Sequence, residues 1–322
     1  MLTLFRNKKQ GYIGWLILYL FILKVALFFK TPTVISHSSD GLLYTSCVQS
    51  ITSFSKNNQV AYTLIILCMQ LLLALLVNSI VLQYKLLKQA SNITAAIFLL
   101  ITSLLPCFNY LSAPFIVCIL LLLIVRLICD IGNTTKPLQV LFWVGILLGL
   151  SLFIYSYAIL FIVLVFISIL QFRAFVLREY VLVIVGTILP LVYYISGIYL
   201  SSGTHLIPYL VHFSLKLPSL FNSVLYNITL LLIGILTLMG LVLSQVQSVQ
   251  MNIQARKIWG LLFVYFVIAL LLFLCTYGEG VYSLWLLPAS FFISCLLYNL
   301  PTKWGNSLAW LLLLLALFNM WY

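Results

Sequence analysis

The chain has 322 residues, of which 65% are hydrophobic and 6% charged, and its formal net charge is +12. One soluble core cannot bury so large an apolar fraction without large exposed patches, which excludes a soluble globular protein. The cations are spread along the chain and form no patch with interleaved aromatic residues, so no nucleic acid partner is expected and anionic lipid is the expected counter-charge.

The uncharged stretches are the length of membrane spans. An unpaired backbone group in a bilayer costs several kcal/mol, so spans are helices or closed barrels. The run 61–83 lacks the alternation of a barrel strand, which predicts an all-α, polytopic membrane protein with residues 1–322 as one integral membrane domain. Eleven spans of about 17–25 residues are predicted: 11–29, 60–83, 92–108, 112–129, 138–154, 157–172, 180–199, 224–246, 258–275, 281–298 and 306–321. The pairs of spans within 92–129, 138–172 and 281–321 are short or closely spaced.

The cations fall mainly in every second loop. The positive-inside rule then predicts a cytoplasmic amino terminus and, with eleven spans, an external carboxyl terminus. The external side holds only Lys30, Lys56 and Lys216, and Lys24, inside the first span, is expected to reach back to the external surface. Twelve of the sixteen lysines and arginines lie on the predicted cytoplasmic side: Arg6, Lys8, Lys9, Lys85, Lys88, Arg126, Lys136, Arg173, Arg178, Arg256, Lys257 and Lys303.

The first long external loop covers 30–59. Leu43, Cys47, Ile51 and Phe54 recur at helical spacing with serines on the opposite face, which predicts an interfacial helix with Asp40 at its amino end. Asp40 is then either the N-cap of this helix or a catalytic carboxylate, and a cap can also be catalytic. His37 and Tyr44, on either side of it, are candidates for binding substrate.

The second long external loop covers 200–223. His205, His212 and Lys216 are spaced by seven and four residues, so on a helix they would share a face and hold a phosphate at the membrane surface. The alternative is an amphipathic helix with its polar face in water, although two prolines in the loop disfavour an unbroken helix. Glu279 is the other external carboxylate and a candidate for binding substrate; the alternative is a solvated residue, since its flanking glycines indicate an exposed turn.

The titratable residues exclude several functions. Asp40 and Glu279 are predicted outside and Asp130 and Glu179 inside, so no carboxylate lies in the hydrocarbon and an ion-coupled carrier is disfavoured. Three histidines cannot make a four-histidine iron site, and the cysteines show no metal or disulfide spacing, so neither a metal nor another cofactor is expected. Amides within spans are expected to bond neighbouring helices: Gln70, Asn78 and Asn227.

One predicted cytoplasmic loop contains a recognisable sequence motif. Residues 172–180, Phe-Arg-Ala-Phe-Val-Leu-Arg-Glu-Tyr, follow an upstream apolar run that ends in Arg126. The loop resembles the Phe-Arg-Pro-Phe-x-x-Arg-Glu-Trp loop of a family of uncharacterised polytopic inner-membrane proteins of Gram-negative bacteria, with departures at Ala174 and Tyr180. This resemblance implies a bacterial inner-membrane location and brings no chemistry. The loop is either a structural anchor, with Arg173 and Arg178 on lipid phosphates and Glu179 paired with one of them, or a docking site for a partner.

The layout also resembles that of GT-C glycosyltransferases, which use polyprenyl-phosphate sugars. In those enzymes the first span leads into an external loop with an acidic residue and surface helices, and another long external loop follows the seventh span. Asp40 and the loop 200–223 hold the matching places here, although the paired acidic and metal-binding motifs of several GT-C families are absent. The resemblance implies Asp40 as base and His205, His212 and Lys216 as phosphate partners.

Two hypotheses follow. The protein is either a GT-C-type transferase, or a relative, that uses a polyprenyl-phosphate-linked sugar at the periplasmic face, or a non-catalytic membrane subunit that scaffolds an envelope-assembly or export complex. A cavity that is lined by Asp40 and open to lipid would favour the transferase. Asp40 acting only as a helix cap would favour the scaffold, whose partners would be other membrane proteins.

Overall fold

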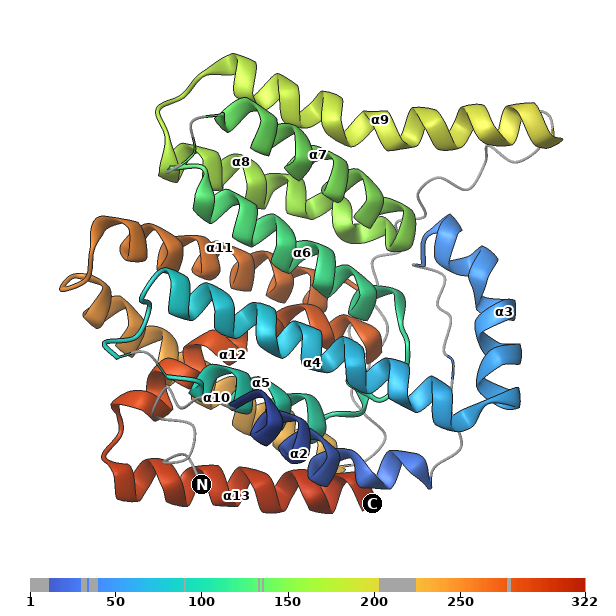
Figure 1. Ribbon diagram of the computed structural model, residues 1–322. Coiled ribbons are helices and arrows are strands. Elements are labelled where there is room, and N and C mark those ends of the chain that lie inside the picture. Colours follow the sequence, from blue (N-terminus) through green and yellow to red (C-terminus); the bar gives the residue numbers. More distant parts are fainter. Residues whose placement is uncertain are drawn as a thin grey trace.

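The structure is a computed structural model that describes residues 12–29, 34, 40–89, 91–132, 134, 136–202, 224–276 and 279–321. The regular elements among these residues are helices (Figure 1). They are α2 (Tyr12–Lys24), η1 (Val25–Phe28), α3 (Leu42–Asn57), α4 (Gln59–Gln83), α5 (Ile93–Leu104), η2 (Pro106–Phe108), α6 (Ala113–Asp130), α7 (Pro137–Ile154), η3 (Ser156–Leu160), α8 (Phe161–Phe172), α9 (Leu177–Ser202), α10 (Val224–Ser248), α11 (Ile253–Cys275), η5 (Glu279–Val281), α12 (Tyr282–Asn299) and α13 (Thr302–Trp321).

Seven of the described helices are long and apolar enough to cross a membrane: α4, α6, α7, α9, α10, α11 and α12. Three shorter apolar helices lie at Ile13–Phe28, Ile93–Leu104 and Ser156–Phe172. The prediction of a polytopic helical membrane protein is therefore confirmed. Each of the eleven predicted spans coincides with one of the helices, whereas the number that cross the bilayer stays a prediction.

The long helices run side by side in alternating directions, so their loops gather at two ends (Figure 1). The loops that join α4 to α5, α6 to α7, α8 to α9, α10 to α11 and α12 to α13 lie at one end, which we call the Arg173 end. The opposite end, where α3 lies, is the Asp40 end. The described cations that the sequence assigns to the cytoplasmic side belong to the Arg173 end. The alternation of charge thus agrees with the fold, and which end faces the cytoplasm stays a prediction.

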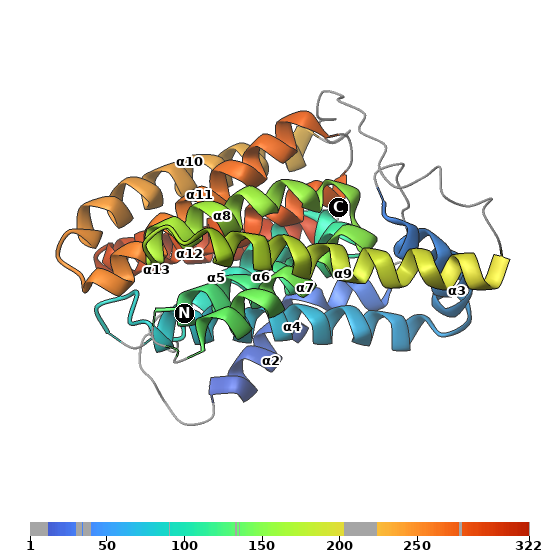
Figure 2. The same ribbon diagram turned by 90° about the horizontal axis from the view of Figure 1, so that it is seen from above.

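Two helices lie in the centre of the bundle. All twelve residues of α5 are buried, and α12 is buried from Tyr282 to Tyr298. Helices α2, α4 and α13 pack against α5, and helices α6, α10 and α11 pack against α12. Figure 2 shows α10 and α11 along one side of the bundle and α2 and α4 along the other. The serines of α12 are compatible with this dry position because their hydroxyls donate to carbonyls of the preceding turn, as Ser290 does to Leu287 at 2.7 Å.

Glycines allow close helix packing at two places. In α7, Cβ atoms at Gly145 and Gly149 would meet backbone atoms of α9, including the Thr187 carbonyl oxygen at 2.6 Å. In α10, a Cβ at Gly240 would lie well inside contact distance of the Phe292 carbonyl of α12. Small residues at helix contacts are a common way to pack helices within lipid, where van der Waals contact replaces the hydrophobic effect.

Two amides within spans bond neighbouring segments, as predicted. The Gln70 side chain donates to the Phe108 carbonyl at 2.5 Å, and Asn78 donates to the Asn92 side chain at 2.8 Å. Both amides are buried. They connect α4 to the segments at the two ends of the short helix α5. These hydrogen bonds add to the small contact area that a helix of so few turns can offer its neighbours.

The prediction for Lys24 is wrong. Instead of reaching the surface, the side chain is 1% exposed and points into the bundle. Its ammonium donates to the Thr102 carbonyl at 2.8 Å and to Asn109 Oδ1 at 2.5 Å. Thr102 lies in the last turn of α5, where the carbonyl end of the helix dipole favours a cation. Lys24 thereby fixes the end of α2 against the connection between α5 and α6.

We expect Asn109→Leu to lower the free energy of unfolding more than Lys24→Met. The first change leaves a buried ammonium with one acceptor fewer, at a cost of about 3 kcal/mol, whereas the second leaves neutral acceptors, at about 1–2 kcal/mol. Thermal unfolding in detergent of both variants and of the double variant measures the coupling. Asn57→Leu, at an exposed position of α3, is the control. Additive effects of the two changes would contradict this account.

Candidate functional site

Helix α3 lies across the Asp40 end of the bundle, transverse to the membrane-length helices (Figure 1). The predicted helix after Asp40 is thus present, but the face that contacts the protein is shifted from the predicted apolar stripe. Tyr44, Val48 and Ile51 pack on the core, whereas Leu43 and Phe54 are 39% and 40% exposed. The helix carries one apolar strip for the bundle and a second beside it that suits contact with lipid.

Asp40 is not the N-cap of α3. The N-cap position is Gly41, which has no side chain to make a cap hydrogen bond. Asp40 instead pairs with Tyr155 in an isolated antiparallel bridge, and the Gly41 amide donates to the Ile154 carbonyl at 2.9 Å. The displacement by one residue has a steric cause. A Cβ at position 41 would overlap the Phe153 carbonyl, so only glycine allows the chain to pass so close to the end of α7.

This bridge holds the Asp40 carboxylate in a largely buried position. The residue is 9% exposed, and it is close enough to act electrostatically on the phenols of Tyr44 and Tyr155. Tyr155 continues the cluster, since its ring lies 5.6 Å from that of Tyr157. Asp40 therefore lies between α3 and the end of α7 in a setting of aromatic side chains.

Tyr44 connects α3 to the loop before α6. Its hydroxyl donates to the Leu111 carbonyl at 2.7 Å, and the Leu111 amide donates to the Tyr62 hydroxyl at 3.1 Å. Burial raises the pKa of Tyr44 above its usual range, and the neighbouring Asp40 and Tyr62 act in the same direction. Tyr44 thus keeps its proton at neutral pH and remains a donor, and its hydroxyl serves to position α3.

The remaining candidates for this site are not placed by the structure. His37, His205, His212 and Lys216 lie outside the described residues, and so does the side chain of Glu279, which begins η5. Of the predicted site residues, the structure brings together Asp40 and Tyr44. Within the described residues, no three His, Cys, Asp or Glu side chains gather as metal ligands would.

Sequence reasoning missed the residues that build this site. Gly41, Tyr62 and Tyr155 hold the segment around Asp40, although none of them was singled out. A signal was present in part, because tyrosines are frequent where spans meet the membrane surface, and Tyr155 and Tyr157 follow α7 directly. The glycine after Asp40 could be recognised only once the Phe153 carbonyl was known to lie against it.

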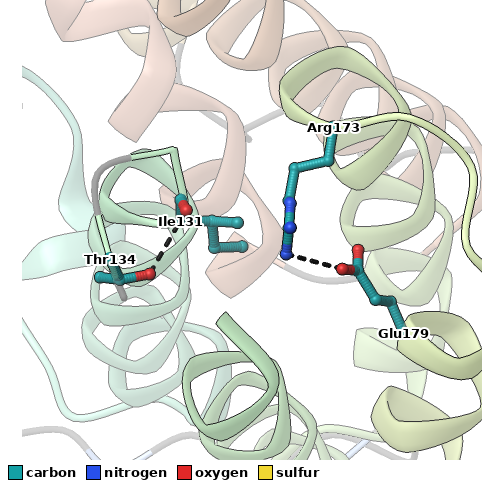
Figure 3. A network of polar contacts seen from close by, with 4 residues as sticks. All are labelled: Ile131, Thr134, Arg173 and Glu179. Atoms are coloured by element: carbon teal, nitrogen blue, oxygen red, sulfur yellow. Dashed lines mark hydrogen bonds and ion pairs between the residues drawn. The ribbon is translucent and has the colours of Figure 1, made fainter. Parts of the chain in front are cut away.

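The Arg173 end contains the ion pair that the sequence suggested. Arg173 Nη1 donates to Glu179 Oε1 at 2.6 Å, and the two side chains face each other across the turn between α8 and α9 (Figure 3). Arg173 follows the last residue of α8, and Glu179 lies in the first turn of α9. Each charge therefore occupies the helix end whose dipole favours it. The Glu179 side chain is 4% exposed and that of Arg173 is 35% exposed.

Aromatic residues of the same loop complete the turn. The Tyr180 ring lies 5.0 Å from that of Phe175 and 5.4 Å from that of Phe166. Lys257 of α11 donates to the Phe172 carbonyl at 3.2 Å and sits over the Phe172 ring. The contacts of the motif thus join α8, α9 and α11.

The other two arginines named with this loop are not part of the pair. Arg178 is exposed. Arg126 is half-buried and interacts electrostatically with Tyr84. The Tyr84 hydroxyl donates to Asp130 at 2.5 Å, so these three residues form a separate polar group between α4 and α6.

We expect Gly41→Ala to lower the free energy of unfolding by about 1–3 kcal/mol, because the new methyl group must push α3 away from the Phe153 carbonyl. Gly14→Ala, in α2, is the matched control, since a Cβ there meets nothing within 4 Å. Thermal unfolding of both variants in one detergent checks this. Equal midpoints for the two variants would show that the contact is not rigid.

We expect Arg173→Met to destabilise the protein more than Glu179→Gln, by about 2–3 kcal/mol against about 1 kcal/mol, because the first leaves a buried carboxylate without its cation. In the second variant the partly exposed arginine can turn to water. Arg178→Met, on the same loop, should change stability by less than about 0.5 kcal/mol. Unfolding midpoints measure the order, and an equal loss in all three would refute a specific ion pair.

Comparison of the chain with protein-family models, with curated proteins and with solved structures finds no match. A function for this protein must therefore be inferred from the geometry of the two ends of the bundle.

Proposed function

We propose that this integral membrane protein is a GT-C-type glycosyltransferase, or a relative, that uses a polyprenyl-phosphate-linked sugar at the periplasmic face of a bacterial inner membrane. The observation that carries the proposal is the position of Asp40. Its largely buried carboxylate is held beside tyrosines at one end of the bundle, one residue before the N-cap position of α3. A carboxylate whose position is fixed by backbone pairing suits proton transfer better than one on an unanchored loop.

In the proposed reaction Asp40 accepts the proton of an acceptor hydroxyl as the hydroxyl oxygen attacks the anomeric carbon of the sugar. The bond between that carbon and the phosphate oxygen breaks, and the polyprenyl phosphate leaves with the electron pair. The leaving phosphate gains negative charge, which nearby cations would stabilise. We assign this role to His205, His212 and Lys216, with His37 and Glu279 as further substrate contacts.

Tyr44 has a supporting part in this proposal. Because its hydroxyl donates to Leu111, it orients α3 and the segment that carries Asp40. The bridge with Tyr155 fixes the same segment from the other side. Asp40 is thus positioned by two helices that are far apart in the sequence, α4 through Tyr62 and α7 through its last turn.

The second candidate is a non-catalytic scaffold subunit. The observation that favours it is α9, the least buried of the seven membrane-length helices. Val181, Val185 and Val192 are exposed along it, and Phe175 and Leu177 are exposed at its start. In this candidate a neighbouring membrane protein would cover α9, with Arg178 at the edge of the contact.

Mass spectrometry of lipids that copurify in mild detergent distinguishes the two candidates. We expect Asp40→Asn, which keeps the size of the side chain, to lower transfer by about 10²–10⁴-fold and to retain a polyprenyl-phosphate sugar that the wild type consumes. Asp130→Asn, at the opposite end of the bundle, is the matched control and should behave like the wild type. Phospholipid alone in every sample, together with a retained protein partner, would refute the transferase and favour the scaffold.

A further inference from the structure

An apolar groove of about 330 Å³ lies between α10, α11 and α12. Leu230, Gly234 and Leu238 of α10 form one side of it, Phe266 and Phe273 of α11 form another, and Trp285 of α12 also lines it. The rings of Phe266 and Phe273 lie 6.4 and 6.3 Å from that of Trp285, so the aromatic side chains support one another. The groove is therefore preformed, as small-molecule sites commonly are.

Gly234 makes the groove. Six residues further along α10, Gly240 is in close contact with α12, whereas a Cβ at Gly234 would meet nothing within 4 Å. Gly240 therefore brings α10 and α12 together, whereas Gly234 leaves space beside α10. A glycine inside a helix is destabilising relative to alanine, and at position 234 no close helix contact offsets this cost.

The groove is continuous with the surface that faces lipid. Leu231, Ile235 and Leu238, on and beside its rim, are all more than half exposed on a membrane-length helix. The one hydroxyl in the lining, that of Thr237, donates to the Gly234 carbonyl at 2.7 Å. The indole N–H of Trp285, the other polar group of the lining side chains, is buried. The lining therefore presents an almost wholly apolar surface, and an occupant with a polar group at this depth would lose its hydrogen bonds. A hydrocarbon chain fits these conditions.

The length of the groove indicates which kind of hydrocarbon chain it fits. From Leu230 to Leu238 the helix rises about 12 Å, and one leaflet of the hydrocarbon layer is about 15 Å thick. Helix α10 begins at the Asp40 end with Val224, and the groove starts about 9 Å further along the helix, at Leu230. It ends at Leu238, just past the middle of the helix, so most of its length lies in the half nearer the Asp40 end. A groove of this length holds most of a single acyl chain, whereas a polyprenyl chain extends well beyond one leaflet.

We propose that the groove between α10 and α11 is a binding site for one acyl chain of a phospholipid in the leaflet at the Asp40 end. The bound chain fills the space that Gly234 leaves and completes the packing of α10 against α11 and α12. This inference goes beyond the proposed transferase and does not depend on it, because no residue of the groove belongs to the Asp40 site.

The test uses the full-length protein in nanodiscs of phosphatidylethanolamine and phosphatidylglycerol that contain a phosphatidylethanolamine with a diazirine on one acyl chain. After photolysis, mass spectrometry of peptides should find the label on the groove residues of α10 and α11. A Cβ at position 234 meets nothing within 4 Å, so Gly234→Leu can place its side chain in the groove. We expect it to reduce that label by about tenfold.

Gly197→Leu is the matched control, because Gly197 of α9 is an exposed helical glycine whose Cβ would also meet nothing within 4 Å. It should leave the label unchanged, and so should Asp40→Asn, so the result is separate from that of the transferase test. Equal labelling of the wild type and Gly234→Leu would refute the site. Displacement of the label by equimolar polyprenyl phosphate would assign the groove to that chain instead, and cross-links between two copies would assign it to a second protein molecule.

Discussion

The structure depends on one constraint, namely that a polar group within hydrocarbon must find its hydrogen-bond partner inside the protein. The serines of α12 satisfy it locally by donating to their own helix. Gln70 and Asn78 satisfy it between segments, and in doing so they fix where the short helix α5 lies. Lys24 satisfies it in the most demanding form, because its partners must also compensate for a charge. Polar side chains in this bundle therefore specify which helices are neighbours, while the apolar residues supply the contact area.

The two ends of the bundle follow the same constraint with different chemistry. At the Arg173 end an ion pair and a cation over an aromatic ring hold α8, α9 and α11, and the charges agree with the helix dipoles. At the Asp40 end, backbone pairing and tyrosine hydroxyls hold α3 against α7 and the loop before α6. The carboxylate of Asp40 thereby lies in a largely buried position one residue before the N-cap position of α3. The proposed transferase depends on this position.

Hydropathy was sufficient to predict every long helix, because spans of an uncharged length admit few alternatives in lipid. Loop charges predicted that successive loops lie at alternate ends of the bundle, since the two ends differ strongly in their numbers of lysines and arginines. The pairing of Glu179 could be predicted because both partners lie in one short loop. Lys24 could not, because its acceptors lie 78 and 85 residues away and hydropathy carries no information on partners. The shift of the α3 cap to Gly41 depends on a carbonyl of α7, which no local pattern reveals.

The position of α12 has a consequence for biosynthesis. Among the seven membrane-length helices it has the lowest hydropathy and is the most deeply enclosed. It leaves the ribosome after its neighbours α5 and α6, which precede it in the chain. Those helices must wait in the bilayer with their inner faces exposed to lipid or to each other until α12 arrives. A chain truncated before residue 282 would therefore lack the helix against which α5, α6, α10 and α11 pack.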